Sequence, residues 1–551
     1  MNEHQKEHHR EREHFFGAAK IVAALTILSR ISGLFRNMAI TALGANRVTS
    51  AFRVAFGVPN LFRRLFGEGA LSAALIPVFS ETAEKSGLEK ARLLLSNLIA
   101  LAAVVLSTLA VVIASGLVIW VWVSWQATDL RLLLTMTLIM LPFMISVCLL
   151  ALAAAALNCR GHFVYPAFAP IILNLFQIAA AIAALKWISS TPSSLLLVST
   201  SVPLAGLVQL LGIIWLLKRS GLGLVLRLRP LEPGIKVVLR LVAPALMGLG
   251  FLQFCELLQL VLGWVMAATP GSPELNLFGW HIVKPLDEGD VARIDTARQL
   301  YQLPMGVLAM SLATTIFPLL SRYASRNDMP ALQESVNRAI RLSLLEGLAA
   351  GAGLFVLADP IIIFLFRRAK FTHDDALRAA WVLKYYCLGI WANCVYVILI
   401  RAFYALKDYR TPLKIAVVLT TFSVLSLMAM LIWIPQLGPA SFGLSISLTT
   451  SLTVILLAAA LRRRIGSFGD RQLALSIAKS VLATAIMVAA IEALLWALRA
   501  WHLDRPWLAT IAGVTVGTAV LYLAAKLLRM PELDEMLGRL RKKSPPAKPL
   551  G

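Results

Sequence analysis

Long apolar segments recur along the chain from about residue 21 to about residue 528. A helix needs about 20 mostly apolar residues to cross a bilayer, and in lipid every backbone polar group must be paired internally. Apolar residues make up 59% of the 551 residues, whereas they are roughly half of a soluble domain. The sequence therefore predicts an all-α polytopic membrane protein with little chain left for a soluble domain.

Charged residues, proline and glycine divide the apolar sequence into about fourteen expected transmembrane helices. They are expected near residues 21–43, 48–82, 94–121, 131–158, 167–187, 195–217, 237–268, 297–321, 339–366, 378–406, 412–434, 441–461, 474–499 and 506–528. The basic loop RRRIGSFGDR sets the last two apart, so we expect two six-helix lobes followed by an added pair. The expected regions are a cytoplasmic tail at 1–18, an N-terminal lobe at 19–218 (helices 1–6), a C-terminal lobe at 219–464 (helices 7–12), helices 13 and 14 at 465–530, and a basic cytoplasmic tail at 531–551.

The formal net charge of +23 does not indicate a nucleic-acid partner. A nucleic-acid-binding protein gathers Lys and Arg on one exposed face, but here they lie in the loops between apolar segments. With the N-terminus inside, most of the loop Lys and Arg fall on the cytoplasmic side, as the positive-inside rule requires. We therefore expect both termini in the cytoplasm. The five cysteines have no CxxC spacing, so neither a disulfide framework nor a metal site is expected.

Five arginines interrupt the otherwise apolar first and second segments: Arg30, Arg36, Arg53, Arg63 and Arg64. An arginine at the bilayer centre costs about 2.5–3.5 kcal/mol on insertion scales, so it normally faces a cavity or a partner. Guanidinium groups bind phosphate oxygens through paired hydrogen bonds, and a low-dielectric chamber strengthens that pairing. The cluster therefore favours a diphosphate head group as the ligand. The alternative is that some of these side chains extend to the membrane interface.

The second, seventh and eighth segments add the polar residues Glu68, Gln253, Glu256, Arg298 and Gln299. Glu256 is the only acid in a strongly apolar stretch, so it pairs with an arginine, is protonated, or binds a coupling cation. Arg298 is a candidate for a further cation of the same chamber. Bends in the backbone are expected at Pro59 and Gly67 in the second segment and at Pro304 and Gly306 in the eighth.

Several runs of sequence resemble a known family over most of the chain. They are SRISGLFRNMAITALGA, TSAFRVAFGVPNLFRRLFGEGALSAALIPVFSE, ALNCRGHFVYPAFAPIILN, ARQLYQLPMGVLAMSLATTIFPLLS, IIIFLFRRAKFT, RAFYALKDYRTPLK and GLSISLT. In this order and spacing they are similar to the MurJ (MviN) lipid II flippases of the multidrug/oligosaccharidyl-lipid/polysaccharide exporter superfamily.

The resemblance implies two six-helix lobes, two extra C-terminal helices and a cationic central cavity that opens alternately to each side of a bacterial inner membrane. The essential arginines of the family would fall on Arg36, Arg63 and Arg64, and Arg30 matches another. The implied substrate is lipid II, an undecaprenyl-diphosphate-linked disaccharide-peptide, and the implied further partners are membrane lipids and cell-wall synthesis proteins. No nucleotide-binding loop is present, so we expect no cofactor; the membrane potential or an ion gradient is left as the source of energy.

The sequence departs from the pattern of the family at three places. Asn37 stands where an acid usually follows the first-helix arginine, and Ser50 stands where another acid is expected. In the eighth helix, Arg298 and Gln299 occupy positions that usually hold aspartate and arginine. The positive charge has thus moved by one residue, which is about 100° around a helix.

Other functions stay open alongside a lipid II flippase. One is the export of another polyprenyl-diphosphate-linked saccharide, and another is a degenerate scaffold member of the family. A membrane enzyme would need acid/base or metal-binding carboxylates, and Asp287, Glu288 and Asp290 are the only tight acidic cluster in the outer loops. We expect these three to lie in a solvated loop and the protein not to be an enzyme.

Overall fold

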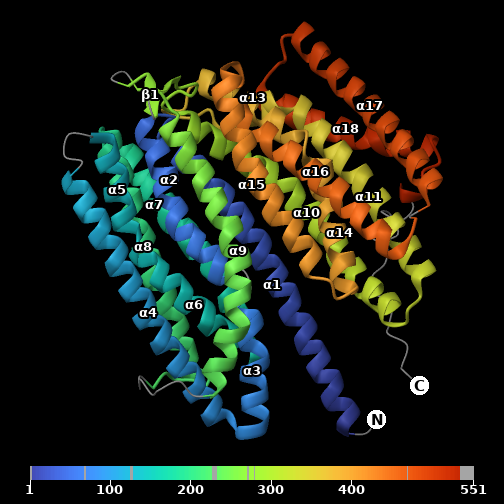
Figure 1. Ribbon diagram of the computed structural model, residues 1–551. Coiled ribbons are helices and arrows are strands. Elements are labelled where there is room, and N and C mark those ends of the chain that lie inside the picture. Colours follow the sequence, from blue (N-terminus) through green and yellow to red (C-terminus); the bar gives the residue numbers. More distant parts are fainter. Residues whose placement is uncertain are drawn as a thin grey trace. The chain divides into compact units, whose positions relative to one another are not determined.

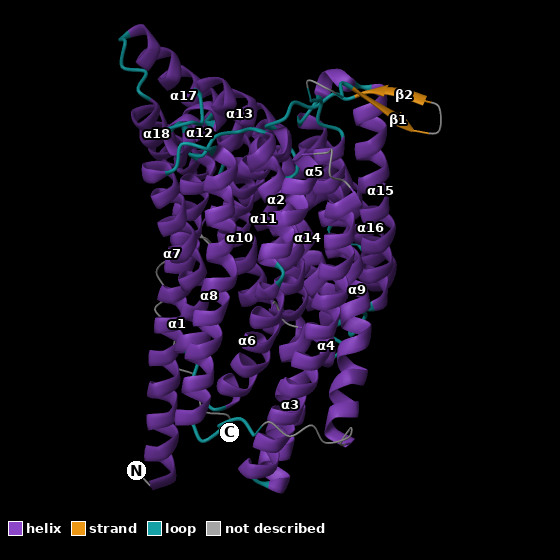
Figure 2. Cartoon of the chain, turned by 90° about the vertical axis from the view of Figure 1, so that its left-hand side faces the viewer, coloured by secondary structure: helices purple, strands orange, loops and turns teal. Residues whose placement is uncertain are grey.

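The chain folds into two compact units, Met1–Ala267 with Arg368–Phe371, and Ala268–Arg367 with Thr372–Gly551. The structure is a computed structural model that describes residues 3–67, 70–123, 128–225, 233–269, 272–277, 280–467 and 469–533. Helices dominate both units, and Figures 1 and 2 show them as long rods. This architecture confirms the prediction of a helical polytopic protein.

The first unit is built from consecutive helices joined mostly by short connections. Its described elements are α1 (Glu3–Thr41), α2 (Arg47–Phe62), the π-helix η1 (Arg63–Gly67), α3 (Ala70–Ser86), α4 (Leu88–Val123), α5 (Thr128–Met140), α6 (Pro142–Cys159), α7 (Val164–Trp187), α8 (Thr191–Arg219) and α9 (Pro233–Val265). Helix α7 packs against both α1 and α8, and α6 packs against α8 and α4. The helix α1 begins well before residue 21, so some of the predicted N-terminal tail at 1–18 is helical.

The predicted interruption of the second apolar segment is confirmed. Helix α2 contains Pro59, and it gives way to the π-helix η1 at Arg63. Proline removes a backbone donor from the helical ladder, and single π-turns occur often at functional sites. Glu68 lies outside the described residues, and α3 resumes at Ala70.

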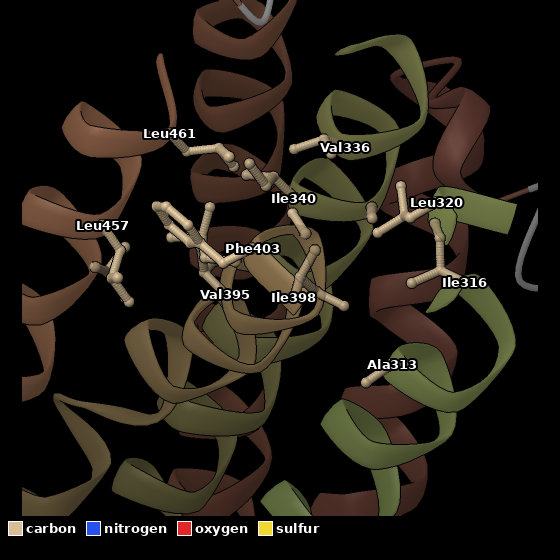
Figure 3. Packing of buried hydrophobic residues seen from close by; sticks show 14 of the residues in the cluster. Ala313, Ile316, Leu320, Val336, Ile340, Val395, Ile398, Phe403, Leu457 and Leu461 are labelled. Atoms are coloured by element: carbon tan, nitrogen blue, oxygen red, sulfur yellow. The ribbon is translucent and has the colours of Figure 1, made fainter. Parts of the chain in front are cut away.

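The second unit contains the remaining helices and a small hairpin. Its described elements are β1 (Glu274–Leu277), β2 (Trp280–Val283), α10 (Asp290–Ser325), α11 (Met329–Val356), α12 (Ala358–Phe366), α13 (His373–Cys387), α14 (Ile390–Ala405), α15 (Arg410–Trp433), the 3-10 helix η2 (Pro435–Leu437), α16 (Ala440–Ile465), α17 (Asp470–Ala500) and α18 (Pro506–Leu527). Figure 3 shows Ile340 of α11, Phe403 of α14 and Leu461 of α16 meeting in its apolar core.

The described helices account for most of the predicted spans. Ten are long and apolar enough to cross a membrane, and two bent pairs raise the number to twelve. The other two predicted spans, at 48–82 and 237–268, correspond to the broken α2–η1–α3 segment and to α9. The prediction of fourteen spans therefore stays a prediction. In α10 the axis bends by 44° between Gly306 and Ser311, just after Pro304, where a bend was expected.

Residues 269–296, which connect the seventh and eighth expected helices and include the acidic cluster, differ in two ways from the prediction of an all-α protein with a solvated loop. Strands β1 and β2 form an antiparallel hairpin in which Glu274 pairs with Val283 (Figure 2), so the protein is not wholly α-helical. Asp290 is buried rather than solvated, because its carboxylate accepts a hydrogen bond of 2.7 Å from Arg293 Nη1 and another of 2.7 Å from the backbone N–H of Asp287. The expectation of a solvated loop was therefore wrong for Asp290.

Helix α9 packs within the first unit, against α2, η1 and α3 (Figure 1). Gly57 of α2 permits this approach, because a Cβ atom there would lie 2.8 Å from Leu257 Cδ1. At the end of α9, the Arg47 guanidinium stacks on the Trp264 ring at 3.8 Å and donates a hydrogen bond of 2.7 Å to the Trp264 carbonyl. The predicted boundary at residue 218 assigns α9 to the C-terminal lobe. The two compact units do not test this assignment, so the division into six-helix lobes stays a prediction.

Candidate functional site: arginines of the first unit

Arg36 is held by neutral amide oxygens. Its Nε and Nη2 atoms donate to Asn37 Oδ1 at 3.2 and 3.0 Å, and its Nη1 donates to Asn174 Oδ1 at 3.2 Å. Asn174 is itself fixed, because its Nδ2 donates to Ser32 Oγ at 2.8 Å and to the Ser29 carbonyl at 3.1 Å. These two asparagines orient the guanidinium without supplying a negative charge.

Asn174 was not predicted from the sequence. It lies on α7 and is buried, and it ends the run ALNCRGHFVYPAFAPIILN that contributed to the family resemblance. Its side chain is neutral, so it does not interrupt the apolar segment as an arginine does. A polar amide inside an apolar helix was the available signal, since such a group in lipid must find a hydrogen-bond partner.

The other predicted arginines of α1 and α2 lie in different surroundings. Arg53 is buried and its Nη2 donates to Thr41 Oγ1 at 3.1 Å, which links α2 to α1. Arg36 also lies over the Phe56 ring, with its Cζ atom 6.0 Å from the centroid, so it too faces α2. Arg30 is exposed on α1, which fits the alternative of a side chain that extends to the interface.

Arg63 and Arg64 open the π-helix η1. Arg63 Nε donates to Asn60 Oδ1 at 2.9 Å. Arg64 Nη1 donates to Gln253 Oε1 at 3.2 Å and forms an ion pair with Glu256 on α9. Of the three alternatives for Glu256, the structure therefore favours pairing with an arginine, and Gln253 binds the same arginine from the preceding helical turn.

In the second unit, Gln299 Nε2 donates to Asp295 Oδ2 at 2.7 Å. Arg298 lies half-buried on α10. The structure thus gives Gln299 a partner on its own helix, one turn earlier. Arg298 belongs to a different unit from the other five arginines, and its membership of a shared chamber stays a prediction.

The displaced charge of α10 can be tested by moving it back. We expect Arg298→Ala to inactivate the protein and Gln299→Ala to have a mild effect. The double variant Arg298→Asp with Gln299→Arg should recover the activity that Arg298→Asp alone loses, because an arginine at 299 lies next to Asp295 and keeps a cation on the helix. Growth of cells depleted of their own homologous protein measures each variant, and full growth with Arg298→Ala would show that Arg298 is not needed.

Among the described residues, no three His, Cys, Asp or Glu side chains come together in a way that could hold a metal ion. Four cysteines (Cys148, Cys255, Cys387 and Cys394) are buried, and Cys159 is half-buried. All five are free thiols.

The protein has many apolar helices, and several of these helices carry arginines that bond to neighbouring helices. This combination defines the class of polytopic membrane transporters. The family described as "Lipid II flippase MurJ" matches residues 39–504, and the chain belongs to this family. It is accordingly a multi-pass protein of the bacterial inner membrane, in a family of flippases rather than of catalytic enzymes.

Relatives agree with this membership, and solved structures share the fold. A probable lipid II flippase MurJ of Bdellovibrio bacteriovorus is 32% identical over 74% of this chain and 75% of its own length. The lipid II flippase MurJ of Burkholderia cenocepacia is 31% identical over 82% of this chain and 84% of its own length. The fold is similar to a lipid II flippase MurJ in an inward closed conformation, with a TM-score of 0.70 and 21% identity over 92% of this chain and 98% of that one. An inward-facing multidrug resistance transporter of the MATE family and MOP superfamily has a TM-score of 0.66 at 14% identity over 82% of this chain and 99% of that one.

Proposed function

We propose that this protein translocates lipid II from the inner to the outer leaflet of the cytoplasmic membrane by alternating access. The observation that carries this proposal is the arginine set of the first unit in a chain that belongs to the lipid II flippase family. Arg36 presents a guanidinium that the amides of Asn37 and Asn174 orient, and a diphosphate is the ligand that such a group binds most strongly. The polyprenyl tail would stay in the surrounding lipid while the head group crosses.

The transport step needs no covalent chemistry. Two of the three carboxylates of the acidic cluster are held by arginines, since Asp290 is bonded to Arg293 and Asp287 is paired with Arg378. We propose that the carrier uses no cofactor and is reset by the membrane potential or an ion gradient. An inward-moving charge experiences about 2.3 kcal/mol per elementary charge for each 100 mV.

We also propose an orientation in the membrane, which rests on the positive-inside rule. Both termini are placed in the cytoplasm, which puts the hairpin of β1 and β2 outside. Membrane lipids and cell-wall synthesis proteins are the further partners that we propose. A thiol-reactive reagent that cannot cross the membrane would label a cysteine introduced at the exposed His281 only if this orientation is right.

Complementation tests the function directly. In cells depleted of their own flippase, expression of this chain should restore growth, and lipid II should become accessible to a lipid II-cleaving enzyme added outside. The variant Arg64→Ala serves as the control, because we expect it to insert and to be inactive once the guanidinium is removed. A chain that is inserted and leaves lipid II inaccessible would contradict the proposal. It would favour the export of another polyprenyl-diphosphate-linked saccharide or a scaffold role.

A further inference from the structure

The described partners of Arg36 include neutral amides, and those of Arg64 include a carboxylate. The hydrogen bonds that Arg36 donates to Asn37 and Asn174 end on neutral amide oxygens. Arg64 instead pairs with the carboxylate of Glu256. The amides orient a guanidinium without offsetting its charge, whereas the carboxylate offsets it. A phosphate that approaches Arg64 therefore meets a site where an anion is already bound.

We propose that Glu256 is a resident counter-ion of Arg64 that a phosphate group of the substrate displaces during transport. This inference rests on the proposed function and adds a residue that sets the strength of phosphate binding. Carboxylate and phosphate oxygens compete for the same N–H donors of a guanidinium group. Arg64 is thus a cation that exchanges one anionic partner for another.

The solvent exposure of the Arg64–Glu256 ion pair supports the proposal that a phosphate can replace Glu256 at Arg64. The Arg64 side chain is 21% exposed and that of Glu256 is 41% exposed. In the second unit, the ion pair of Arg293 with Asp290 is sealed, at 9% and 3% exposure. Opening a sealed pair leaves buried charges without partners, but a partly exposed pair can be opened with water or a ligand taking over. The Arg64–Glu256 pair is partly exposed, so a phosphate can reach Arg64 and replace the carboxylate without leaving a buried charge unpaired.

The contacts that α9 makes with the rest of the first unit also support the exchange of Glu256 for a phosphate. Gln253 precedes Glu256 by three residues and accepts a hydrogen bond from the same Arg64 Nη1 atom. Residues three apart lie on one face of a helix, so Gln253 keeps Arg64 aimed when Glu256 is displaced. The stacking of Arg47 of α2 on Trp264 holds the end of α9 against α2. The exchange therefore requires a side-chain movement and not a movement of the helix.

The test compares lipid II binding by the full-length protein in lipid nanodiscs. Glu256→Gln keeps the shape and an acceptor oxygen but removes the competing charge, so its Kd for lipid II should fall roughly fivefold. Its translocation should slow, because the head group is released less readily. In the Arg64→Ala background the same substitution should change the Kd little, because the pair no longer exists. An undecaprenol control, which has no phosphate, should bind all variants alike.

A second variant keeps the proposal testable if Glu256→Gln fails to fold. Gln253→Glu adds another carboxylate beside Arg64, so it should weaken lipid II binding by roughly the same factor. The proposal is overturned if Glu256→Gln binds lipid II no more tightly than the wild type, or if its gain persists with Arg64→Ala. Absence of binding and of complementation by the wild type would instead reject the proposed function.

Discussion

Arg36→Ala is expected to abolish translocation while leaving the protein inserted in the membrane. The substitution removes a guanidinium that Asn37 and Asn174 hold in place through neutral amides. A hydrogen bond to a charged group contributes about 1.5–3 kcal/mol, so the loss of binding is roughly tenfold or more. The measurements are growth of flippase-depleted cells, exposure of lipid II at the outer face, and the amount of inserted protein.

The lysine variant separates charge from geometry. Arg36→Lys keeps the positive charge but loses the planar fork, so it cannot reach both asparagines and a phosphate together. We expect intermediate activity. Asn174→Ala removes one acceptor of Arg36 and should also give a partial loss, since Asn37 remains. Wild-type activity for Arg36→Lys would mean that charge alone suffices.

Helices of the protein were largely predictable because the bilayer sets their length and polarity. The interruption of the second apolar segment was expected from its Pro and Gly residues, but α2 continues through Pro59 to Phe62 and the π-helix η1 begins only at Arg63. The hairpin of β1 and β2 was missed because each strand has only four residues, and the connecting loop carries no strong turn signal. Short elements of this kind depend on the rest of the fold more than on their own sequence.

The candidate site was predicted where charge marks it and missed where it does not. Arg64 and Glu256 were both selected from the sequence as charged residues in apolar helices, and they meet in the structure. Asn174 escaped because it is neutral and lies far along the chain from Arg36. Asp290 was misjudged for a related reason. Its partner Arg293 is visible three residues later, but its burial depends on α13, which the local sequence does not reveal.

Asp290, Arg293 and Asp375 form a buried cluster of charged residues that connects the beginnings of α10 and α13. Arg293 Nη2 donates to Asp375 Oδ1 at 2.7 Å, and Arg293 Nη1 donates to Asp290 Oδ1 at the same distance. Asp375 Oδ2 accepts from the Thr372 backbone N–H at 2.9 Å, and Thr372 Oγ1 accepts from the Asp375 backbone N–H at 3.1 Å, in a capping box at the start of α13. The arginine therefore joins the beginning of α10 to the beginning of α13. All three charged residues are buried.

Arg293→Ala is accordingly expected to destabilise the protein by about 3–5 kcal/mol, because it leaves two buried carboxylates without their cation. Arg378→Ala is the matched control: its ion pairs with Asp287 and Asp374 are exposed, and such pairs contribute about 0–1 kcal/mol. The apparent melting temperature in nanodiscs should fall far more for Arg293→Ala than for Arg378→Ala. Equal melting temperatures would mean that water replaces Arg293 at the two carboxylates, and the cluster would then be a surface feature.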